Sequence, residues 1–360
     1  MTLAVRIGVL RLVDSAPVLV ARERGLFDAL GLDVEVSVEP SWANAADKLT
    51  YGLLDAAIML PPLVLAAAMG LRGPKARLVV PMGLSQGGNA VVLGNPAANS
   101  VAAAGCPRGR MLGDWLRLER RRLGVAPRFA VVHHFSTHNL LLRYWLAGAG
   151  VDPDRDIETV VVPPEQVVDA LASGRIAGFC AGAPWGDAAE QAGAGRVLLG
   201  SSRIWPAHPE KCLALGQTWA ESHPDAARRL IRALLRAQIL CDMPSEAPSI
   251  AALLAHPDEL GLPEGPTRAA LAEGVGAEQI RFHAGAAWFP ARTHALWFLT
   301  QMRRWGWIDA GVDLDQVARS VYRPDLLAAV AAEEGIPACV ATAGGLEPVW
   351  LPTVFPPEQK

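Results

Sequence analysis

Strand-length apolar runs alternate with amphipathic helical patterns through the first 200 residues, and this alternation restricts the possible folds more than any other feature. In the opening unit, VRIGVL (5–10) is followed by a helical pattern over 16–32, and DVEVSVEP (33–40) then alternates with a period of two residues. Pro17 stands where a first helical turn tolerates proline, and Gly31 is typical of a helix end. Strands separated by helices indicate βαβ units and parallel sheets. The pattern therefore predicts an α/β protein.

The length of the chain predicts two lobes. Its 360 residues exceed the roughly 250–300 residues at which a single core stops growing. A second set of strand and helix patterns begins near residue 97, and KCLALG (211–216) has the pattern of a strand that returns to the first lobe. From residue 223 onward the pattern is mainly helical.

We therefore expect lobe 1 to consist of residues 1–92 with 200–360, and lobe 2 of residues 93–199. Each lobe should contain a mostly parallel sheet flanked by helices. Ligands of such sheets bind beyond the carboxyl ends of the strands, so we expect a ligand cleft between the lobes.

Composition and charge exclude several classes of protein. Hydrophobic residues make up 51% of the chain and charged residues 19%, which argues against disorder. A net charge of -3 provides no basic field for direct binding of nucleic acid or of an anionic membrane surface. No stretch reaches the roughly 18–20 uninterrupted apolar residues that span a bilayer, so no membrane contact is expected.

The N-terminus indicates the compartment. The opening MTLAVRIGVL lacks the basic segment, apolar run and small-residue cleavage site of a secretory leader, and it reads instead as a first strand. We expect a cytoplasmic protein; the alternative is an exported protein whose leader has been removed. The chain ends in a proline-rich segment, EPVWLPTVFPPEQK, for which an irregular strap or a frayed end is expected.

The cysteines predict neither a disulfide framework nor a zinc site. They are odd in number, widely spaced and without a CxxC motif. Buried thiols are the expectation for all five: Cys106, Cys180, Cys212, Cys241 and Cys339.

The loop EPSWANAADKL (39–49) is the first candidate for ligand binding. Trp42 stands just before a predicted helix, and Asn44 is a candidate N-cap. A helix start offers unpaired N–H groups and a positive dipole end, and an indole adds a flat wall, so the loop suits a planar oxyanion. The structural alternative is a packed indole and a plain helix cap.

The segment LSQGGNAVVL (84–93) is the second candidate. Its Gly-Gly pair brings the amides of Gln86 and Asn89 close to the expected cleft, and amide donors bind an anion without adding charge. An ordinary glycine turn with solvated amides is the alternative.

The third candidate comes from the second lobe. In VVHHFSTHNLLLRYWL (131–146) a strand ends and a helix begins, so that a hydroxyl cap near Thr137 and the imidazole of His138 would face the site. A metal site built from His138 with the two preceding histidines is disfavoured, because no carboxylate or cysteine stands nearby at ligand spacing. We expect neither a metal nor a cofactor.

Lys211, in HPEKCLALG (208–216), is the fourth candidate. It precedes the returning strand and would supply the single positive charge that a partly buried anion needs. A solvated lysine is the alternative. The later tryptophans Trp288, Trp297, Trp305 and Trp307 stand at helical spacing and predict core or interlobe packing.

Enzyme signatures are missing from the sequence. It contains no GxSxG, GxxxxGK[ST] or HExxH motif, and no GxGxxG that opens a helix after a strand. A non-enzymatic protein is therefore expected.

Four blocks of the chain resemble the nitrate- and bicarbonate-binding receptors of cyanobacterial-type ABC uptake systems, together with their leaderless cytoplasmic relatives, the NasS-type nitrate/nitrite sensors. The resemblance runs over nearly the whole chain and implies the type II, periplasmic-binding-protein-like fold. The blocks are VLRLVDSAPVLVARERGLFDALGLDVEV, PSWANAADKL, THNLLLRYWLAGAGVDPDRDI and HPEKCLALG.

The resemblance implies a nitrate site formed by Trp42, Asn89, His138 and Lys211. The nitrate receptor has the longer glutamine where this chain has Asn89, so the choice among nitrate, nitrite and bicarbonate stays open. NasS-type sensors hold an ANTAR-type RNA-binding antiterminator inactive and release it when nitrate or nitrite binds, and the resemblance implies such a partner here. The alternatives are the receptor of a nitrate or bicarbonate ABC transporter, and an enzyme of the same fold acting on a small organic substrate.

Overall fold

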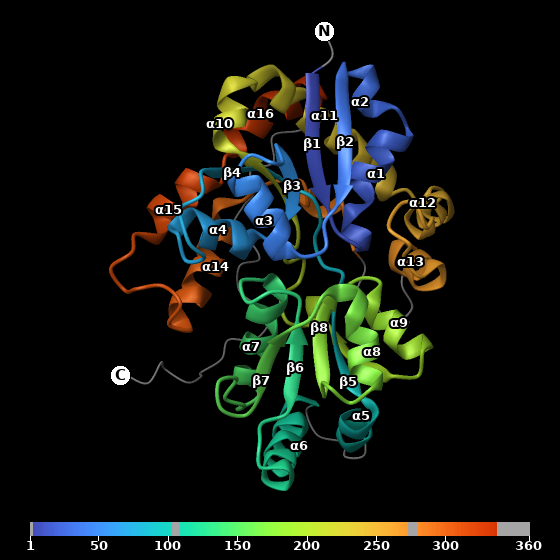
Figure 1. Cartoon of the computed structure of the whole chain (residues 1–360), viewed down its shortest axis with the longest axis vertical. Coiled ribbons are helices and arrows are strands. Elements are labelled where there is room, and N and C mark those ends of the chain that lie inside the picture. Colours follow the sequence, from blue (N-terminus) through green and yellow to red (C-terminus); the bar gives the residue numbers. More distant parts are fainter. Residues whose placement is uncertain (1–2, 103–107, 273–279, 337–360) are drawn as a thin grey trace.

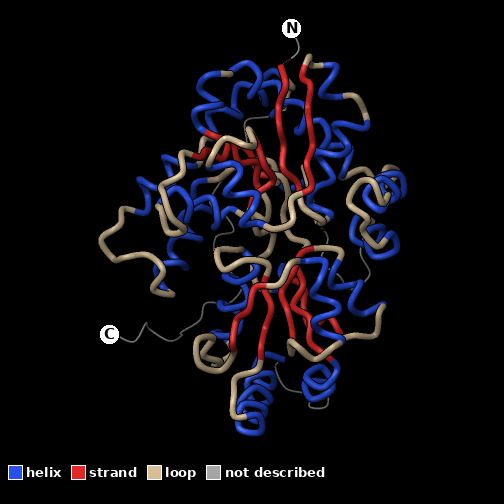
Figure 2. The backbone as a smooth tube through the Cα atoms, in the orientation of Figure 1, coloured by secondary structure: helices blue, strands red, loops and turns tan. Residues whose placement is uncertain are grey.

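The computed structural model describes residues 3–102, 108–272 and 280–336, and it shows two lobes with a sheet in each (Figure 1). Helices flank both sheets (Figure 2), and further helices from the C-terminal part of the chain lie around the first lobe (Figure 1). The predicted two-lobed α/β architecture is confirmed.

The elements follow one another in three groups. Lobe 1 begins with β1 (Leu3–Val9), the 3-10 turn η1 (Val13–Ser15), α1 (Ala16–Glu23), α2 (Leu26–Ala29), β2 (Leu32–Val38), α3 (Trp42–Thr50), β3 (Ala56–Met59), α4 (Pro61–Met69) and β4 (Leu78–Gly83). Lobe 2 contains β5 (Asn89–Gly94), α5 (Asn95–Ala102), α6 (Arg108–Leu123), β6 (Arg128–Val131), α7 (Thr137–Gly148), β7 (Glu158–Val161), η2 (Pro164–Gln166), α8 (Val167–Ala172), β8 (Gly178–Gly182), α9 (Trp185–Gln191) and β9 (Gly195–Gly200). The chain continues through η3 (Ser201–Arg203), β10 (Cys212–Gly216), α10 (Gln217–Ser222), α11 (Pro224–Cys241), α12 (Ala247–Ala255), α13 (Glu264–Leu271), η4 (Ala284–Ala286), α14 (Arg292–Arg304), α15 (Leu314–Val321) and α16 (Pro324–Glu333).

One strand of each sheet runs against the others. The order is β2-β1-β3-β10-β4 in lobe 1 and β7-β6-β8-β5-β9 in lobe 2. Strand β10 is antiparallel to β3 and β4, and β5 is antiparallel to β8 and β9. Each reversed strand is the first one after the chain arrives from the other lobe. Because the chain leaves at a carboxyl end, it enters the next sheet at that sheet's carboxyl edge, so the two carboxyl edges face the junction of the lobes.

Two connections join the lobes, residues 84–88 and residues 201–211. The expected boundary between residues 92 and 93 falls inside β5, whose residues pair with β8 and β9 of the second sheet. The change of lobe lies earlier, at Gly87 and Gly88, which have φ values of 70° and 79°. An apolar strand does not itself indicate which sheet it will join.

The long helix expected over residues 16–32 is interrupted. Gly25, with a φ of 64°, separates α1 from α2. Glycine adopts this left-handed conformation without strain, so it ends the first helix before the apolar pattern ends.

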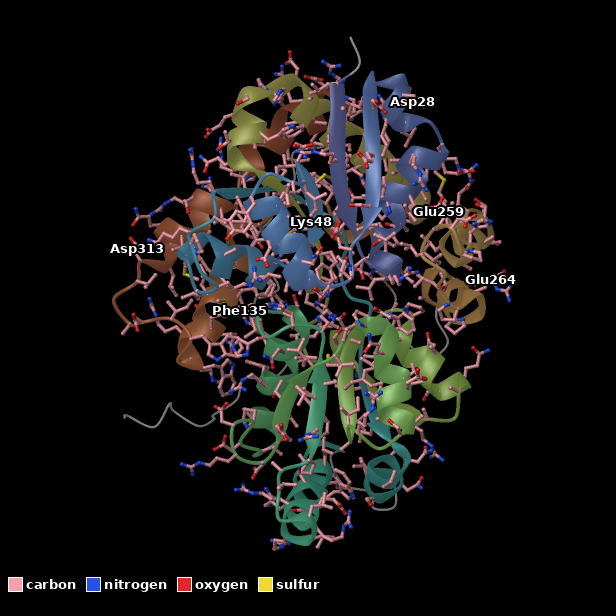
Figure 3. The ribbon with its side chains drawn as sticks, in the orientation of Figure 1. Asp28, Lys48, Phe135, Glu259, Glu264 and Asp313 are labelled. Atoms are coloured by element: carbon pink, nitrogen blue, oxygen red, sulfur yellow. The ribbon has the colours of Figure 1, made fainter. Side chains whose placement is uncertain are left out.

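The C-terminal helices cover lobe 1 and also touch lobe 2. Helix α14 contacts α4 of lobe 1 and α7 of lobe 2, and α13 contacts α9. The ring of Trp297 lies 4.4 Å from that of Trp205 and 5.9 Å from that of Tyr144, and Trp307 lies 4.1 Å from His134. These two tryptophans therefore pack between the lobes, as expected. Phe135, labelled at this junction in Figure 3, lies 5.7 Å from Trp307.

Two other expectations concern the cysteines and membrane-spanning segments. Cys180, Cys212 and Cys241 are buried thiols, whereas Cys106, Cys339 and the proline-rich C-terminal segment lie outside the described residues. Within the described part of the chain, no helix is both long and apolar enough to cross a membrane.

The close approach of β4 to the C-terminal region gives a stability prediction. The N–H of Gly83 donates to the carbonyl of Trp288 at 2.9 Å, and a methyl group on Gly83 would overlap the carbonyl oxygen of Ala287. We expect Gly83→Ala to lower the free energy of unfolding by about 1–3 kcal/mol, measured by urea denaturation. Gly311→Ala is the matched control, because no heavy atom lies within 4 Å of its added methyl group. Equal stability of the two variants would contradict the prediction.

Candidate functional site

Helices α3 and α7, one from each lobe, begin at the junction with the same capping arrangement. Ser41 Oγ accepts a hydrogen bond from the N–H of Asn44 at 3.1 Å, and Ser136 Oγ accepts one from the N–H of Asn139 at 3.1 Å. Both helices therefore direct the positive ends of their dipoles at the junction. The cap of α3 is Ser41, so the prediction that Asn44 caps this helix is wrong. The helix begins at Trp42, three residues before the start at Ala45 that a cap at Asn44 would imply.

A buried ammonium and two buried carboxyl groups lie at the centre of the junction. Lys211 Nζ lies 2.6 Å from Glu210 Oε1 and 3.5 Å from Asp14 Oδ2. All three side chains are at most 2% exposed. We call Asp14, Glu210 and Lys211 the charge cluster. From the sequence, only Lys211 was predicted, as the cation that compensates an anion. The structure shows that this cation is already paired with two carboxyl groups.

The charge cluster holds residues from several segments together. Asn89 Nδ2 donates to Glu210 Oε2 at 2.6 Å, and His138 Nε2 lies 3.4 Å from Glu210 Oε1. Lys211 Nζ lies 5.6 Å from the centre of the Trp42 ring, within the range of a cation–π contact. The structure thus brings together the four residues that the resemblance implied.

Burial and mutual interaction shift the pKa values in the cluster. Burial raises the pKa of Glu210 to about 7, although Lys211 and Asn89 act in the opposite direction. Burial alone would lower the pKa of Lys211, but Asp14 and Glu210 outweigh it and raise that pKa. Burial, with Lys211 and His208 nearby, lowers the pKa of His138 well below its ordinary value. His138 is therefore neutral near pH 7 and contributes one N–H donor rather than a positive charge.

Several buried polar atoms at the junction have no hydrogen-bond partner among the described residues. They include Trp42 Nε1, both ring nitrogens of His138, and Thr137 Oγ1. An unpaired buried donor costs about 1–3 kcal/mol, so unpaired donors gathered at one place indicate a site for an acceptor. Trp42 lies beside Lys211 and His138 beside Glu210, so both unpaired side chains border the charge cluster.

The remaining predicted residues are placed less directly. Asn44 Oδ1 is buried without a partner among the described residues, and Asn89 donates one of its two amide N–H groups to Glu210. The side chain of Gln86 lies beside Gly285, because a methyl group on that glycine would lie 3.4 Å from Gln86 Oε1. The backbone of Gln86 pairs with Arg281 and with Pro209, the residue before Glu210. Its backbone thus lies next to the charge cluster, whereas its side-chain oxygen lies near Gly285.

Sequence reasoning missed Glu210 and Asp14. Glu210 stands next to Lys211 in HPEKCLALG, so its place beside a predicted site residue could have identified it as a candidate. Asp14 lies in η1, just after β1. Ligands bind beyond the carboxyl ends of such strands, so this position could also have been considered. Ser85, which donates to Asp14 Oδ1 through its hydroxyl and accepts from the N–H of Lys211 at 3.2 Å, joins the two connections. No short-range pattern indicates such a contact.

The site is sealed from solvent in this structure. Trp42, Asn89, His138 and Lys211 are each no more than 1% exposed. The lobes also contact one another directly: the N–H of Val13 donates to the carbonyl of Ala183 at 3.1 Å. A ligand therefore reaches the charge cluster only when the lobes separate. Among the described residues, no group of three or more His, Cys, Asp or Glu side chains has a geometry suited to a metal ion.

A model of the NMT1-like family matches residues 2–255 of the chain. The chain belongs to the NMT1-like family. This NMT1-like chain is 30% identical over 377 residues to the nitrate/nitrite binding protein NrtA of Synechococcus elongatus, an alignment that covers 98% of the chain and 84% of NrtA.

Two further likenesses extend the comparison. The NMT1-like chain is 35% identical over 351 residues to the nitrate import ATP-binding protein NrtC of the same organism, covering 95% of the chain. It spans about half of NrtC, 52% of that protein's length. The crystal structure of the periplasmic nitrate-binding protein NrtA from Synechocystis superimposes with a TM-score of 0.84 at 28% identity, covering 93% of the chain and 90% of NrtA. This match confirms the periplasmic-binding-protein fold implied by the resemblance.

The raised pKa of Glu210 predicts a pH-dependent stability. The folded pKa of about 7 exceeds the ordinary value of 4.5, so folding favours the protonated carboxyl. The contribution is complete below pH 4.5 and is lost as the pH rises through 7, by about 3 kcal/mol in total. We expect Glu210→Gln, which stays neutral, to reduce this loss in urea denaturation at pH 5 and pH 8.

The control for that prediction is Glu39→Gln. Glu39 is another buried carboxylate, paired with Lys48 at 2.9 Å on α3 (Figure 3), and its replacement should leave the pH dependence in place. If Glu210→Gln retained the full pH dependence of the unmodified protein, the raised pKa would be assigned to the wrong group.

Proposed function

We propose that this protein is a non-enzymatic receptor whose lobes close on one small oxyanion, nitrate or nitrite. The observation that carries the proposal is the set of unpaired buried donors, Trp42 Nε1 and His138, contributed by helix starts in opposite lobes. A planar oxyanion has acceptor oxygens in several directions, so one ion can bond to both lobes. Binding would then stabilise the closed form relative to the open one.

Each residue has a distinct role in this proposal. Trp42 provides an N–H donor and a flat wall, and neutral His138 provides a second donor. Lys211 supplies the positive charge, while Asn89 holds the Glu210 carboxyl in place. The names of NrtA and NrtC, a nitrate/nitrite binding protein and a nitrate import protein, support the choice of anion.

We further propose that the receptor is a cytoplasmic sensor that controls an ANTAR-type RNA-binding antiterminator by ligand-dependent release. Support comes from the resemblance of its four sequence blocks to NasS-type sensors and from the two states that lobe closure provides. Release requires that the anion bind the free protein better than the partner-bound protein, by a coupling of about 1–3 kcal/mol or more. The closing junction can supply this difference, because the partner need only favour the open form.

The principal alternative is the solute-binding receptor of a nitrate or bicarbonate ABC transporter. The match to the periplasmic protein NrtA over most of both chains favours this alternative as much as the sensor. Cell fractionation of the native gene product separates the two, because a transport receptor is exported and a sensor stays in the cytoplasm. An enzyme acting on an organic substrate is a third candidate, and measured turnover would favour it.

Calorimetric titration tests the anion site. After extensive dialysis, we expect saturable one-to-one binding of nitrate or nitrite, and none of sulfate or chloride. Lys211→Met should weaken this binding at least tenfold, because it leaves two carboxyl groups facing the anion with no cation between them. Lys48→Met is the matched control: it also removes a lysine from a buried glutamate, away from the charge cluster, and should bind normally. Preferred binding of bicarbonate would overturn the proposed anion.

Co-purification tests the sensor role. The tagged protein, expressed in its native cell without nitrate or nitrite, should retain an RNA-binding protein of the ANTAR type, and millimolar nitrate or nitrite in the wash should release it. Lys211→Met should retain the partner in both washes. Retention of membrane permease components in place of an RNA-binding protein would instead establish the transport receptor.

A further inference from the structure

The charge cluster contains more carboxyl groups than cations, so a bound monoanion would increase its net negative charge. Glu210 and Asp14 already share the single ammonium of Lys211, at 2.6 Å and 3.5 Å. The side chains of all three are sealed from water when the lobes are closed. A nitrate or nitrite ion placed beside Trp42 and His138 would add a negative charge to a site that holds two carboxyl groups and one cation. Burying unbalanced charge of this kind is costly.

Building on the proposed function, we propose that nitrate or nitrite binding is coupled to the uptake of one proton by Glu210. The proton comes from solvent and adds to a carboxylate oxygen of Glu210. The anion brings no proton of its own at neutral pH. Uptake of the proton changes Glu210 from an ionised acceptor into a neutral group, so the net charge of the site stays the same when the anion enters.

Geometry selects Glu210 over the other groups that face the site. Its Oε1 is approached by Lys211 at 2.6 Å and by His138 at 3.4 Å, and its Oε2 by Asn89 at 2.6 Å and by His208 at 3.6 Å. Glu210 therefore lies beside both Lys211 and His138, so an anion that contacts these two side chains is close to its carboxyl group. Asp14 lies farther from Lys211 and also accepts a hydrogen bond from the hydroxyl of Ser85.

Burial disfavours a positive charge on two of the histidines in this region. It lowers the pKa of His138, and it lowers that of His294 to about 4. His208 bonds through Nε2 to Ser201 Oγ at 2.6 Å. Burial has already raised the pKa of Glu210 to about 7, and a negative ion beside the carboxyl group would raise it further, so that Glu210 is protonated in the bound state.

The coupling predicts that affinity falls as the pH rises. Binding favours the protonated carboxyl, so the dissociation constant is constant well below pH 7 and increases tenfold per pH unit above it. For a free-state pKa of about 7, the dissociation constant for nitrate should be about tenfold larger at pH 8 than at pH 6.

Calorimetry in amine buffers of different ionisation enthalpy measures the proton directly. At pH 8, the slope of the observed binding enthalpy against the ionisation enthalpy of the buffer should correspond to nearly one proton taken up per nitrate bound. This measurement uses the unmodified protein, so it remains decisive even if a variant fails to fold. Nitrate binding without proton uptake would overturn the inference alone, whereas the absence of any nitrate or nitrite binding would overturn the proposed function as well.

Three variants assign the proton. Glu210→Gln should abolish proton uptake and make nitrate affinity independent of pH between 6 and 8. Glu39→Gln, the buried control outside the cluster, should retain proton uptake. Asp14→Asn removes a negative charge that helps to raise the pKa of Glu210, so it should reduce uptake at pH 8 without abolishing it. Loss of uptake in Asp14→Asn together with its retention in Glu210→Gln would show that the assignment to Glu210 is wrong.

Discussion

The burial of the Lys211 ammonium between two carboxyl groups is the interaction on which the junction of the lobes depends. A buried charge without a partner would cost several kcal/mol, so the surrounding chain must provide partners. Asp14 comes from lobe 1, Glu210 from the second connection, and Ser85, which bonds to both Asp14 and Lys211, from the first. One ammonium therefore organises segments that are as much as about 200 residues apart in the sequence.

The two connections determine where chemistry can be placed. Each connection leaves one sheet at its carboxyl edge and enters the other sheet at its carboxyl edge. The residues next to each connection therefore lie at the junction of the lobes. Residues from both lobes and from both connections then meet without any long excursion of the chain. The same topology accounts for the reversed strands β5 and β10, which are consequences of the crossing and need no separate explanation.

Local signals predicted the part of the site that depends on single segments. The ends of strands and the starts of helices identified Trp42, His138 and Lys211, because those signals occupy a few consecutive residues. The pairing of Lys211 with Glu210 and Asp14 was not predicted, since hydropathy and periodicity do not show which polar groups share one buried volume. The same limit explains the boundary placed inside β5: an apolar strand fits either sheet equally well.

The aromatic contacts between α14 and lobe 2 have a consequence for affinity. Trp297 packs against Tyr144, and Arg143 Cζ lies 4.5 Å from the centre of the Trp305 ring, so these contacts favour the conformation in which the lobes touch. For any ligand enclosed between the lobes, the measured dissociation constant equals the intrinsic one divided by the fraction of molecules able to close. These aromatic residues therefore influence the affinity for any ligand enclosed between the lobes although they lie outside the charge cluster, and substitutions among them would change that affinity without changing the groups that contact the ligand.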